Sequence, residues 1–200
     1  LGKMDHSLDI LIGKSVAPVI VAFVAAPPLT TWQEVNQEYE YGGPATEKYA
    51  QMLAEELVPH LDETYRTIPR PDARAIMGNR SGGLVSLYAV LQHPQVFGKV
   101  AVQSLWLLPP VGDEVLSLVR GQEKQSIQFY MDWDRYDFRS TEYVTFDLPE
   151  DSRKFADVLK EKAYTNAGGE AASGPGWDGW RARTDKILEA LFPLEPRWEQ

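Results

Sequence analysis

Ala75-Ile76-Met77-Gly78-Asn79-Arg80-Ser81-Gly82-Gly83-Leu84 is the stretch that decides the fold of this chain. An apolar run ends at Gly78 and leucines at helical spacing begin at Leu84, which predicts a strand that turns directly into a helix. Glycines on both sides of the turn allow the chain to reverse within a few residues. The spacing is close to the pattern G-x-S-x-G, in which a serine stands at the tip of such a turn. Here Arg80 stands between Gly78 and Gly82, and Ser81 comes one place later.

Strands and helices alternate along the rest of the chain. Apolar runs predict strands at residues 18–24, 73–78, 99–103 and 127–132, with a weaker strand near 168–173. Apolar residues at three- and four-residue steps predict helices at 7–14, 45–66, 82–92, 113–121, 151–163 and 180–191. Pro59 should kink or break the helix at 45–66, and residues 30–44 should form a polar, aromatic loop. The alternation predicts a single α/β domain over residues 1–200, with a mostly parallel sheet and helices on both of its faces.

Little of the chain precedes the first predicted strand. A doubly wound sheet normally carries more strands ahead of this point than residues before 18 can supply. We therefore expect either that the N-terminal strands are missing from this chain, or that another chain covers the edge of its sheet.

The composition argues against several classes of partner. A net charge of −9 disfavours binding to nucleic acid or to an anionic membrane surface. No apolar run reaches the roughly 18 residues of a membrane span, and the chain does not open on a charged start that leads into an apolar stretch. Without cysteine there is neither a disulfide framework nor thiolate chemistry. We expect a soluble protein, with the cytoplasm favoured, that needs no cofactor.

Short motifs along the chain carry a family resemblance. They are Glu56-Leu57-Val58-Pro59, Tyr65-Arg66-Thr67, Arg74-Ala75-Ile76-Met77-Gly78, Gly82-Gly83-Leu84 with Leu87-Tyr88-Ala89, His93-Pro94 with Phe97-Gly98, Gln103-Ser104, and Trp177 with Trp180-Arg181. From about residue 5 to residue 193 the chain resembles the Putative esterase family of α/β-hydrolases, which includes enterochelin esterases, feruloyl esterases, S-formylglutathione hydrolases and mycolyltransferases. The resemblance implies an α/β-hydrolase fold and relationship to carboxylic-ester hydrolases.

The chain departs from this family at the catalytic positions. The family pattern G-x-S-x-G-G-L places Arg80 where the nucleophilic serine belongs, and the pattern G-H-x-W-x-x-W-R places Pro175 where the general-base histidine belongs. Asp137 matches the position of the acid. A guanidinium is not a nucleophile for acyl transfer, and proline has no side chain that moves a proton. These substitutions predict a pseudoenzyme with a ligand-binding or regulatory role.

The histidines lead to the same expectation without an alignment. α/β-Hydrolases order their triad as nucleophile, acid, histidine. The histidines of this chain are His6, His60 and His93, and none of them follows Asp137. A Ser-His-Asp relay therefore cannot be built in the usual order.

Arg80 has two roles that remain open at this point. At a helix N-terminus, a permanent cation beside free backbone amides forms a site for a carboxylate or a phosphate. Alternatively, Arg80 fills the vacated pocket and pairs with Asp137, which is the favoured interpretation. Both hold if a ligand displaces one partner.

Ser81 and the chain as a whole also have alternatives. Ser81 would be the nucleophile of a slipped turn in an active ester hydrolase that uses Asp137 and an unconventional base; more simply, its hydroxyl caps free helix amides. A third hypothesis is a structural subunit that pairs with an active partner or with copies of itself. The apolar run Leu105-Trp106-Leu107-Leu108-Pro109-Pro110 is then either buried or part of an interface.

Ligand and metal candidates complete the prediction. Trp106, Trp133, Trp177 and Trp180 follow strands, where open α/β folds place their ligand crevice, and we expect Trp106 and Trp177 to line the pocket of a small anionic or ester ligand. Asp132, Asp134 and Asp137 do not fit a calcium loop, because Asp137 stands where the loop needs glycine and Tyr143 where it needs glutamate. No metal site is expected.

Overall fold

The computed structural model describes residues 4–24, 37–141 and 145–194. Its main sheet has the parallel strand order β1-β2-β3-β6, with β1 Ala75–Asn79, β2 Lys99–Gln103, β3 Gln128–Asp134 and β6 Glu170–Ala171. Asn79 lies opposite Gln103, and Gln103 opposite Asp132, so the carboxyl ends of β1, β2 and β3 meet at one edge. A separate antiparallel pair joins β4 Arg139–Ser140 to β5 Phe146–Asp147.

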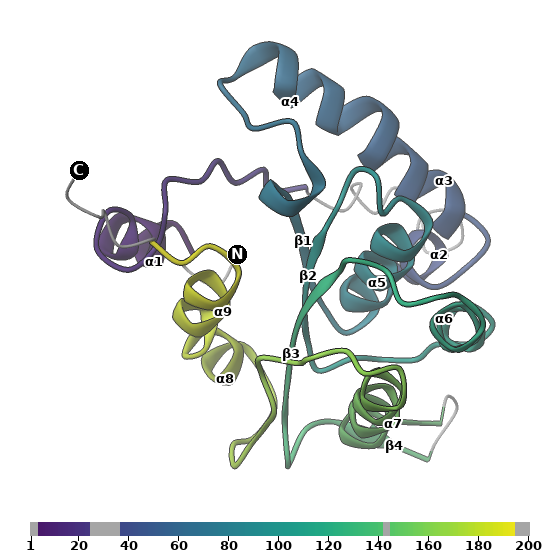
Figure 1. The fold of residues 1–200 in the computed structure, drawn as a ribbon. Helices are drawn as coiled ribbons and strands as arrows, with labels where there is room; N and C mark the ends of the chain where they lie inside the picture. The colour runs from purple at the N-terminus through teal and green to yellow at the C-terminus, as the bar shows by residue number, and fades with distance from the viewer. Residues whose placement is uncertain (1–3, 25–36, 142–144, 195–200) are drawn as a thin grey trace.

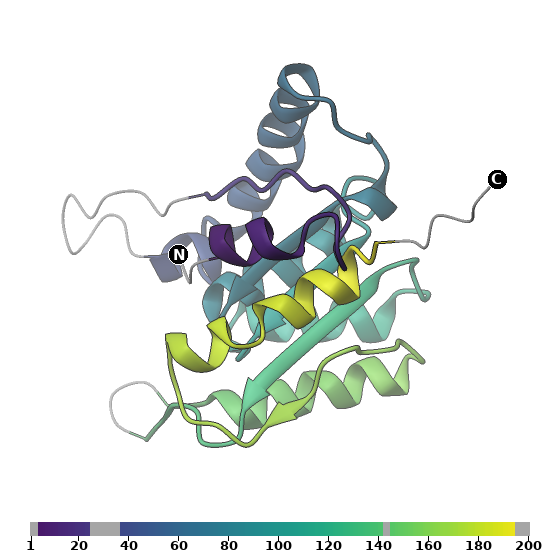
Figure 2. The ribbon, with the colours of Figure 1, turned by 90° about the vertical axis from the view of Figure 1, so that its left-hand side faces the viewer.

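Helices cover both faces of this sheet (Figures 1 and 2). One face carries α5 Ser81–Gln92, α6 Val111–Gly121 and α7 Leu148–Glu161, together with α2 Gln37–Tyr41, α3 Thr46–Met52 and α4 Val58–Thr64. The other face carries α1 Met4–Leu11, α8 Trp177–Arg181 and α9 Thr184–Leu191. The predicted parallel sheet between two helical layers is confirmed.

The alternation of side chains along the strands divides the core between the two faces. Val100, Val102, Phe129 and Met131 belong to the large cluster that includes the buried residues of α5, α6 and α7. The residues between them face the other way: Ala101 and Tyr130 pack with Ile187 and Leu191 of α9. This period of two also decides the site, because Asp132 and Asp134 lie on the α9 face with Tyr130.

The long predicted helix at 45–66 is continuous but changes its winding before Pro59. A π-helical segment, Leu53–Leu57, separates α3 from α4. Pro59 is in the first turn of α4 and has no N–H to donate, so a local change of hydrogen-bond register ahead of it removes a bond that proline could not make. The helix is therefore not broken at Pro59, and what the structure shows ahead of the proline is a π-helical turn.

The predicted buried strand at 18–24 is wrong. The segment has no regular secondary structure, and Ile20, Phe23 and Val24 are 52%, 46% and 40% exposed. An apolar run becomes a strand only where another strand can pair with it, and the chain here is held elsewhere: the Ala17 amide donates to Phe192 O at 2.9 Å. Within the described sheet, β1 is the outermost strand on its side.

Other boundaries also differ from prediction, and the helix expected at 7–14 is α1, which ends at Leu11. The helix expected at 180–191 is divided into α8 and α9, with Arg183 between them. α2 lies inside the loop predicted at 30–44, of which residues up to 36 lie outside the described part of the chain. Within the described ranges, no helix combines the length and the apolar content needed to cross a lipid bilayer.

Candidate functional site

The turn between β1 and α5 places Arg80 at the carboxyl edge of the sheet. Arg80 has φ 50° and ψ −123°, and its amide donates to Gln103 O at 3.0 Å. The glycines make this turn possible: a Cβ at Gly78 would lie 2.2 Å from Gly82 O, and one at Gly83 would lie 2.6 Å from Val102 Cγ1. A non-glycine residue in such a sparsely populated region costs about 1–3 kcal/mol, so the surrounding contacts must enforce it.

The Arg80 side chain lies between two aromatic rings. Its guanidinium carbon is 4.4 Å from the ring centroid of Phe138 and 5.1 Å from that of Trp180, both within range of cation–π attraction. No described carboxylate lies within ion-pair distance of it, and its Nε is buried without a hydrogen-bond partner. The terminal nitrogens also bond to no described residue but keep contact with solvent. Arg80 is therefore a cation held by rings, with donors left free.

The start of α5 adds further donors. Among the described residues, no backbone carbonyl accepts from the amides of Ser81, Gly82 or Gly83, which are the first of the helix. A Cβ built on Gly82 would meet nothing within 4 Å, so there is open space beside the turn. Free amides, the positive end of the helix dipole and a guanidinium together attract an anion.

Ser81 has no partner that would activate it. The residue is 5% exposed, and its hydroxyl makes no hydrogen bond to a described residue, so the predicted capping role is not seen either. His6 is in α1 and His60 in α4. His93 follows α5, a helix of 12 residues, which places it about 18 Å along the axis from Ser81. His93 is therefore too far from Ser81 to act as its base, and among the described residues no hydrogen bond joins His6 or His60 to Ser81.

Asp137 is buried but does not pair with Arg80, so the favoured ion pair between them is wrong. Asp137 is 4% exposed; Oδ1 accepts from the Phe138 amide at 2.8 Å, and Oδ2 is buried without a partner. The adjacent amide of Tyr136 donates to Ser173 O at 3.2 Å, so the segment that leads to Pro175 runs beside Asp137. Pro175 itself is exposed. Arg80 does not pair with Asp137 because its guanidinium packs against the rings of Phe138 and Trp180 instead.

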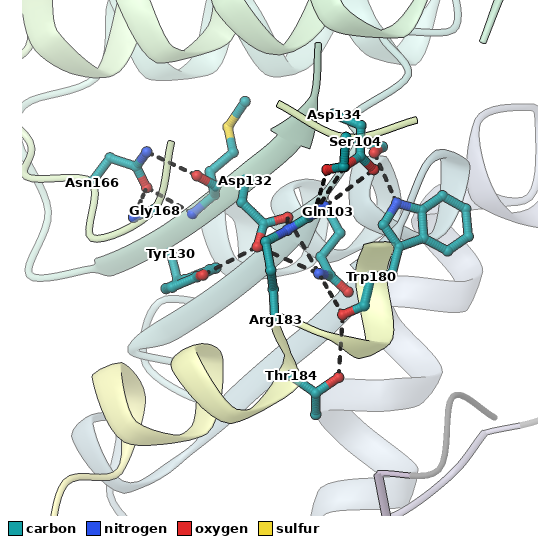
Figure 3. Close-up of polar contacts among 12 residues, drawn as sticks. Gln103, Ser104, Tyr130, Asp132, Asp134, Asn166, Gly168, Trp180, Arg183 and Thr184 are labelled. Atoms are coloured by element: carbon teal, nitrogen blue, oxygen red, sulfur yellow. Dashed lines mark hydrogen bonds and ion pairs between the residues drawn. The ribbon is translucent and has the colours of Figure 1, made fainter. Parts of the chain in front are cut away.

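Asp132 and Asp134 share one guanidinium, that of Arg183 (Figure 3). Arg183 Nη1 and Nη2 donate to the two oxygens of Asp134 at 2.8 and 3.2 Å. Its Nε lies 3.0 Å from Asp132 Oδ1, in a geometry that makes an ion pair rather than a hydrogen bond. Ser173 Oγ donates to Asp134 as well. Burial raises the pKa of Asp132 above its ordinary value, against the opposing effect of Arg183.

This cluster also fixes Trp180 (Figure 3). The ring of Trp180 is one of the two that lie over the Arg80 guanidinium. Gln103 Nε2 donates to Asp132 Oδ1 and to Trp180 O, both at 3.2 Å. The indole Nε1 of Trp180 donates to Ser104 Oγ at 2.9 Å. Because the Arg80 amide bonds to Gln103 O, the β1–α5 turn, the carboxylate cluster and Trp180 form one connected network.

The predicted tryptophans divide into two groups. Trp177 packs edge-on against Trp180, with centroids 5.4 Å apart, and is 52% exposed, so it lies at the rim of the site. Trp106 instead packs against Phe146 at 5.3 Å and makes no ring contact with Arg80. The apolar run that contains it is partly buried: Leu105 and Leu107 are in the core, whereas Pro109 and Pro110 are exposed.

Sequence reasoning missed Phe138 and Arg183. Phe138 directly follows the recognised Asp137, but nothing in its surroundings indicated a contact with a residue at position 80. Arg183 lies two residues after the Trp180-Arg181 motif, and the paired carboxylates Asp132 and Asp134 were considered only as metal ligands. A buried carboxylate pair without a metal needs a cation, and that requirement was the available signal.

Comparison with known proteins identifies the class. The model of the Putative esterase family matches residues 7–191, so the chain belongs to this family of esterase-like α/β-hydrolases. The Bacillus subtilis (strain 168) protein YjcH is 26% identical over 165 residues, which cover 81% of this chain and 66% of YjcH. YbbA from the same organism is 29% identical over 99 residues, or 42% of this chain and 40% of YbbA. The chain thus spans less than two thirds of the length of these relatives.

Solved structures show the same fold. A ferulic acid esterase superposes with a TM-score of 0.60 at 17% identity, covering 72% of this chain and 60% of that one. The S-formylglutathione hydrolase FrmB from Staphylococcus aureus gives 0.54 at 16% identity, with 73% and 65% covered. The enterobactin esterase FES from Shigella flexneri gives 0.57 at 19% identity, with 72% and 38% covered. The predicted α/β-hydrolase fold is confirmed.

Proposed function

We propose that this esterase-family homologue binds a small anionic ligand at the β1–α5 turn and does not hydrolyse esters. One observation carries the proposal: Arg80 occupies the tip of the turn with free donors and no carboxylate partner among the described residues. A half-buried guanidinium without a counter-ion is unfavourable unless something offsets it. The Phe138 and Trp180 rings offset part of that cost, and a bound carboxylate or phosphate would offset more.

The geometry also supports the loss of chemistry. Arg80 stands where the family resemblance expects the nucleophile, and Pro175 where it expects the base. Ser81 has no described histidine near it. Removal of any one triad member lowers the rate by several orders of magnitude, and the residual rate comes from amides and binding. In this chain those amides remain beside a permanent cation, which favours retention of an anion over turnover.

Calorimetric titration with acetate, benzoate and inorganic phosphate tests the binding role. Arg80→Gln keeps a polar but shorter side chain and removes its charge, so anion affinity should fall about ten- to hundred-fold, as for the loss of a charge-assisted hydrogen bond. Arg70→Gln is the matched control, because Arg70 is exposed and pairs with Asp72. If both variants bind like wild type, the anion site is wrong.

Ester turnover and a fluorophosphonate probe test the absence of catalysis. We expect no labelled serine and no hydrolysis above that of heat-treated protein. Labelling of Ser81, mapped by peptide mass, would instead support the active hydrolase that uses a slipped turn with Asp137. Light scattering over a concentration series addresses a role as a structural or self-associating subunit, which requires mass to rise with concentration.

A further inference from the structure

We propose, resting on the function proposed above, that the ligand is a zwitterion whose carboxylate binds Arg80 and whose ammonium group binds Asp137. Amino acids and ω-amino carboxylic acids are the chemical class that this arrangement fits. Two independent features support the assignment: an unsatisfied carboxylate oxygen and an unsatisfied guanidinium nitrogen that both adjoin Phe138, and a charge asymmetry across the edge of the sheet.

The first feature is a pair of opposite charges that do not meet. Asp137 is 4% exposed, and its Oδ2 is buried with no hydrogen-bond partner; Arg80 Nε is buried without one as well. Both groups contact Phe138: the Asp137 carboxylate accepts from its amide at 2.8 Å, and the guanidinium lies over its ring at 4.4 Å. Buried polar atoms are rarely left unpaired in proteins, so each of these two atoms calls for a partner. A single molecule with an anionic and a cationic end supplies both.

The second feature is the direction of charge across the site. The β1 side holds Arg80 and the free amides of α5. The β3 side holds Asp137 together with Asp132 and Asp134, which have only Arg183 between them. Three carboxylates thus stand against one guanidinium, because the neighbouring Arg135 and Arg139 pair with Glu170 and Asp147 instead. β2 lies between the two sides, so their strands are about 10 Å apart. A zwitterion aligned along this direction is favoured at both ends.

The route to Asp137 is set by the segment beside it. Oδ2 has no solvent contact, so an ammonium group reaches it only when the neighbouring chain moves. Gly174-Pro175-Gly176 follows the Ser173 carbonyl that bonds to Tyr136, and side chains added at either glycine would meet nothing within 4 Å. Both glycines have open space beside them, and we expect this stretch to move when the ammonium group binds.

Matched ligand pairs test the proposal by calorimetry. The probes are glycine, β-alanine, 4-aminobutyrate and 6-aminohexanoate, each compared with the acid of the same length that lacks the amine. At its best spacing the amino acid should bind wild type about ten-fold or more tightly than its partner, because a charged hydrogen bond is added. Asp137→Asn should abolish this preference and retain the affinity for simple carboxylates, whereas Arg80→Gln should weaken both. Asp72→Asn, at an exposed ion pair, should behave like wild type.

Each other outcome contradicts a defined part. Equal binding of both members of every pair overturns the zwitterion and leaves the anion site standing. Binding of neither member overturns the proposed function and this inference with it. A preference that survives in Asp137→Asn shows that another group holds the amine. If Asp137→Asn does not fold, Asp137→Glu gives a second reading: its longer side chain should shift the preferred amino acid to a shorter one, and an unchanged optimum would overturn the assignment.

Discussion

Arg183 donates hydrogen bonds from Nη1 and Nη2 to the two carboxylate oxygens of Asp134, at 2.8 and 3.2 Å, although the two residues are 49 positions apart in the sequence. Asp134 ends β3, and Arg183 stands between α8 and α9, so this contact ties the C-terminal helices to the carboxyl edge of the sheet. Both side chains are almost completely buried. The consequences concern stability and pH as much as the site.

Arg183→Gln should be among the most destabilising substitutions in the chain. It leaves Asp132 and Asp134 buried without their shared cation, and breaking a buried ion pair on one side costs about 3–5 kcal/mol. Urea unfolding would measure the change. Arg70→Gln breaks an exposed pair and should change stability by no more than about 1 kcal/mol. Similar losses in the two variants would contradict the importance given to the cluster.

Stability should fall with rising pH through the titration of Asp132. Burial raises the pKa of Asp132 in the folded protein, so the folded state holds this proton more tightly than the unfolded state does. The folded state is therefore favoured at low pH, and this contribution is lost from the ordinary value of 3.8 upward. Asp132→Asn should flatten that decline in a series of urea titrations at different pH. An unchanged slope would contradict it.

Glu170 should act in the opposite direction. Hydrogen bonds from Arg135, Arg153 and Trp133 lower the pKa of Glu170 from 4.5 to about 2. A carboxyl with a lowered pKa stabilises the fold above its ordinary value, and this contribution is lost as pH falls from 4.5 towards 2. Glu170→Gln should remove that acid-side loss and leave the decline assigned to Asp132 in place. The same pH series measures both.

Ser104 and Trp180 should be energetically coupled. Ser104→Ala leaves the buried indole N–H without its acceptor, at a cost of about 1–3 kcal/mol. In a Trp180→Phe background there is no N–H to satisfy, so Ser104→Ala should cost much less. Urea unfolding of wild type, the two single variants and the double variant completes the cycle. Additive losses would show that the hydrogen bond does not contribute.

Gly82 and Gly83 are adjacent and should respond differently to alanine. A Cβ at Gly83 meets Val102 Cγ1 at 2.6 Å, and such overpacking costs about 1–3 kcal/mol. A Cβ at Gly82 meets nothing within 4 Å, so Gly82→Ala should be neutral or stabilise helix α5 by up to about 1 kcal/mol. Thermal unfolding of the two variants distinguishes them. Equal melting temperatures would contradict the packing at Gly83.

Most of the fold could be predicted because its information is local. A window of about a dozen residues is enough to recognise each of the apolar runs of β1, β2 and β3 and the periodic segment of α5. The 18–24 segment misled because apolar composition predicts burial but does not supply a pairing strand. Strand existence depends on neighbours that composition does not describe.

The site was predicted less completely for a related reason. Arg80 and Asp137 were found because family motifs surround them, yet their pairing was wrong, since the Arg80 guanidinium lies over the rings of Phe138 and Trp180 and no local pattern announces these two contacts. Arg183 was missed because no local pattern links it to Asp132, and only the sheet brings the two within 3.0 Å. Contacts between distant charges follow from topology and not from spacing.

The turn that carries Arg80 is held by contacts in which the Arg80 side chain takes no part. Gly78 and Gly83 fit against Gly82 O and Val102, and the Arg80 amide is anchored on Gln103 O; none of these contacts involves the side chain at position 80. The residue type at position 80 can therefore change while the contacts that hold the turn stay the same. A substitution at this position can thus remove one activity without endangering the fold that a later activity would use.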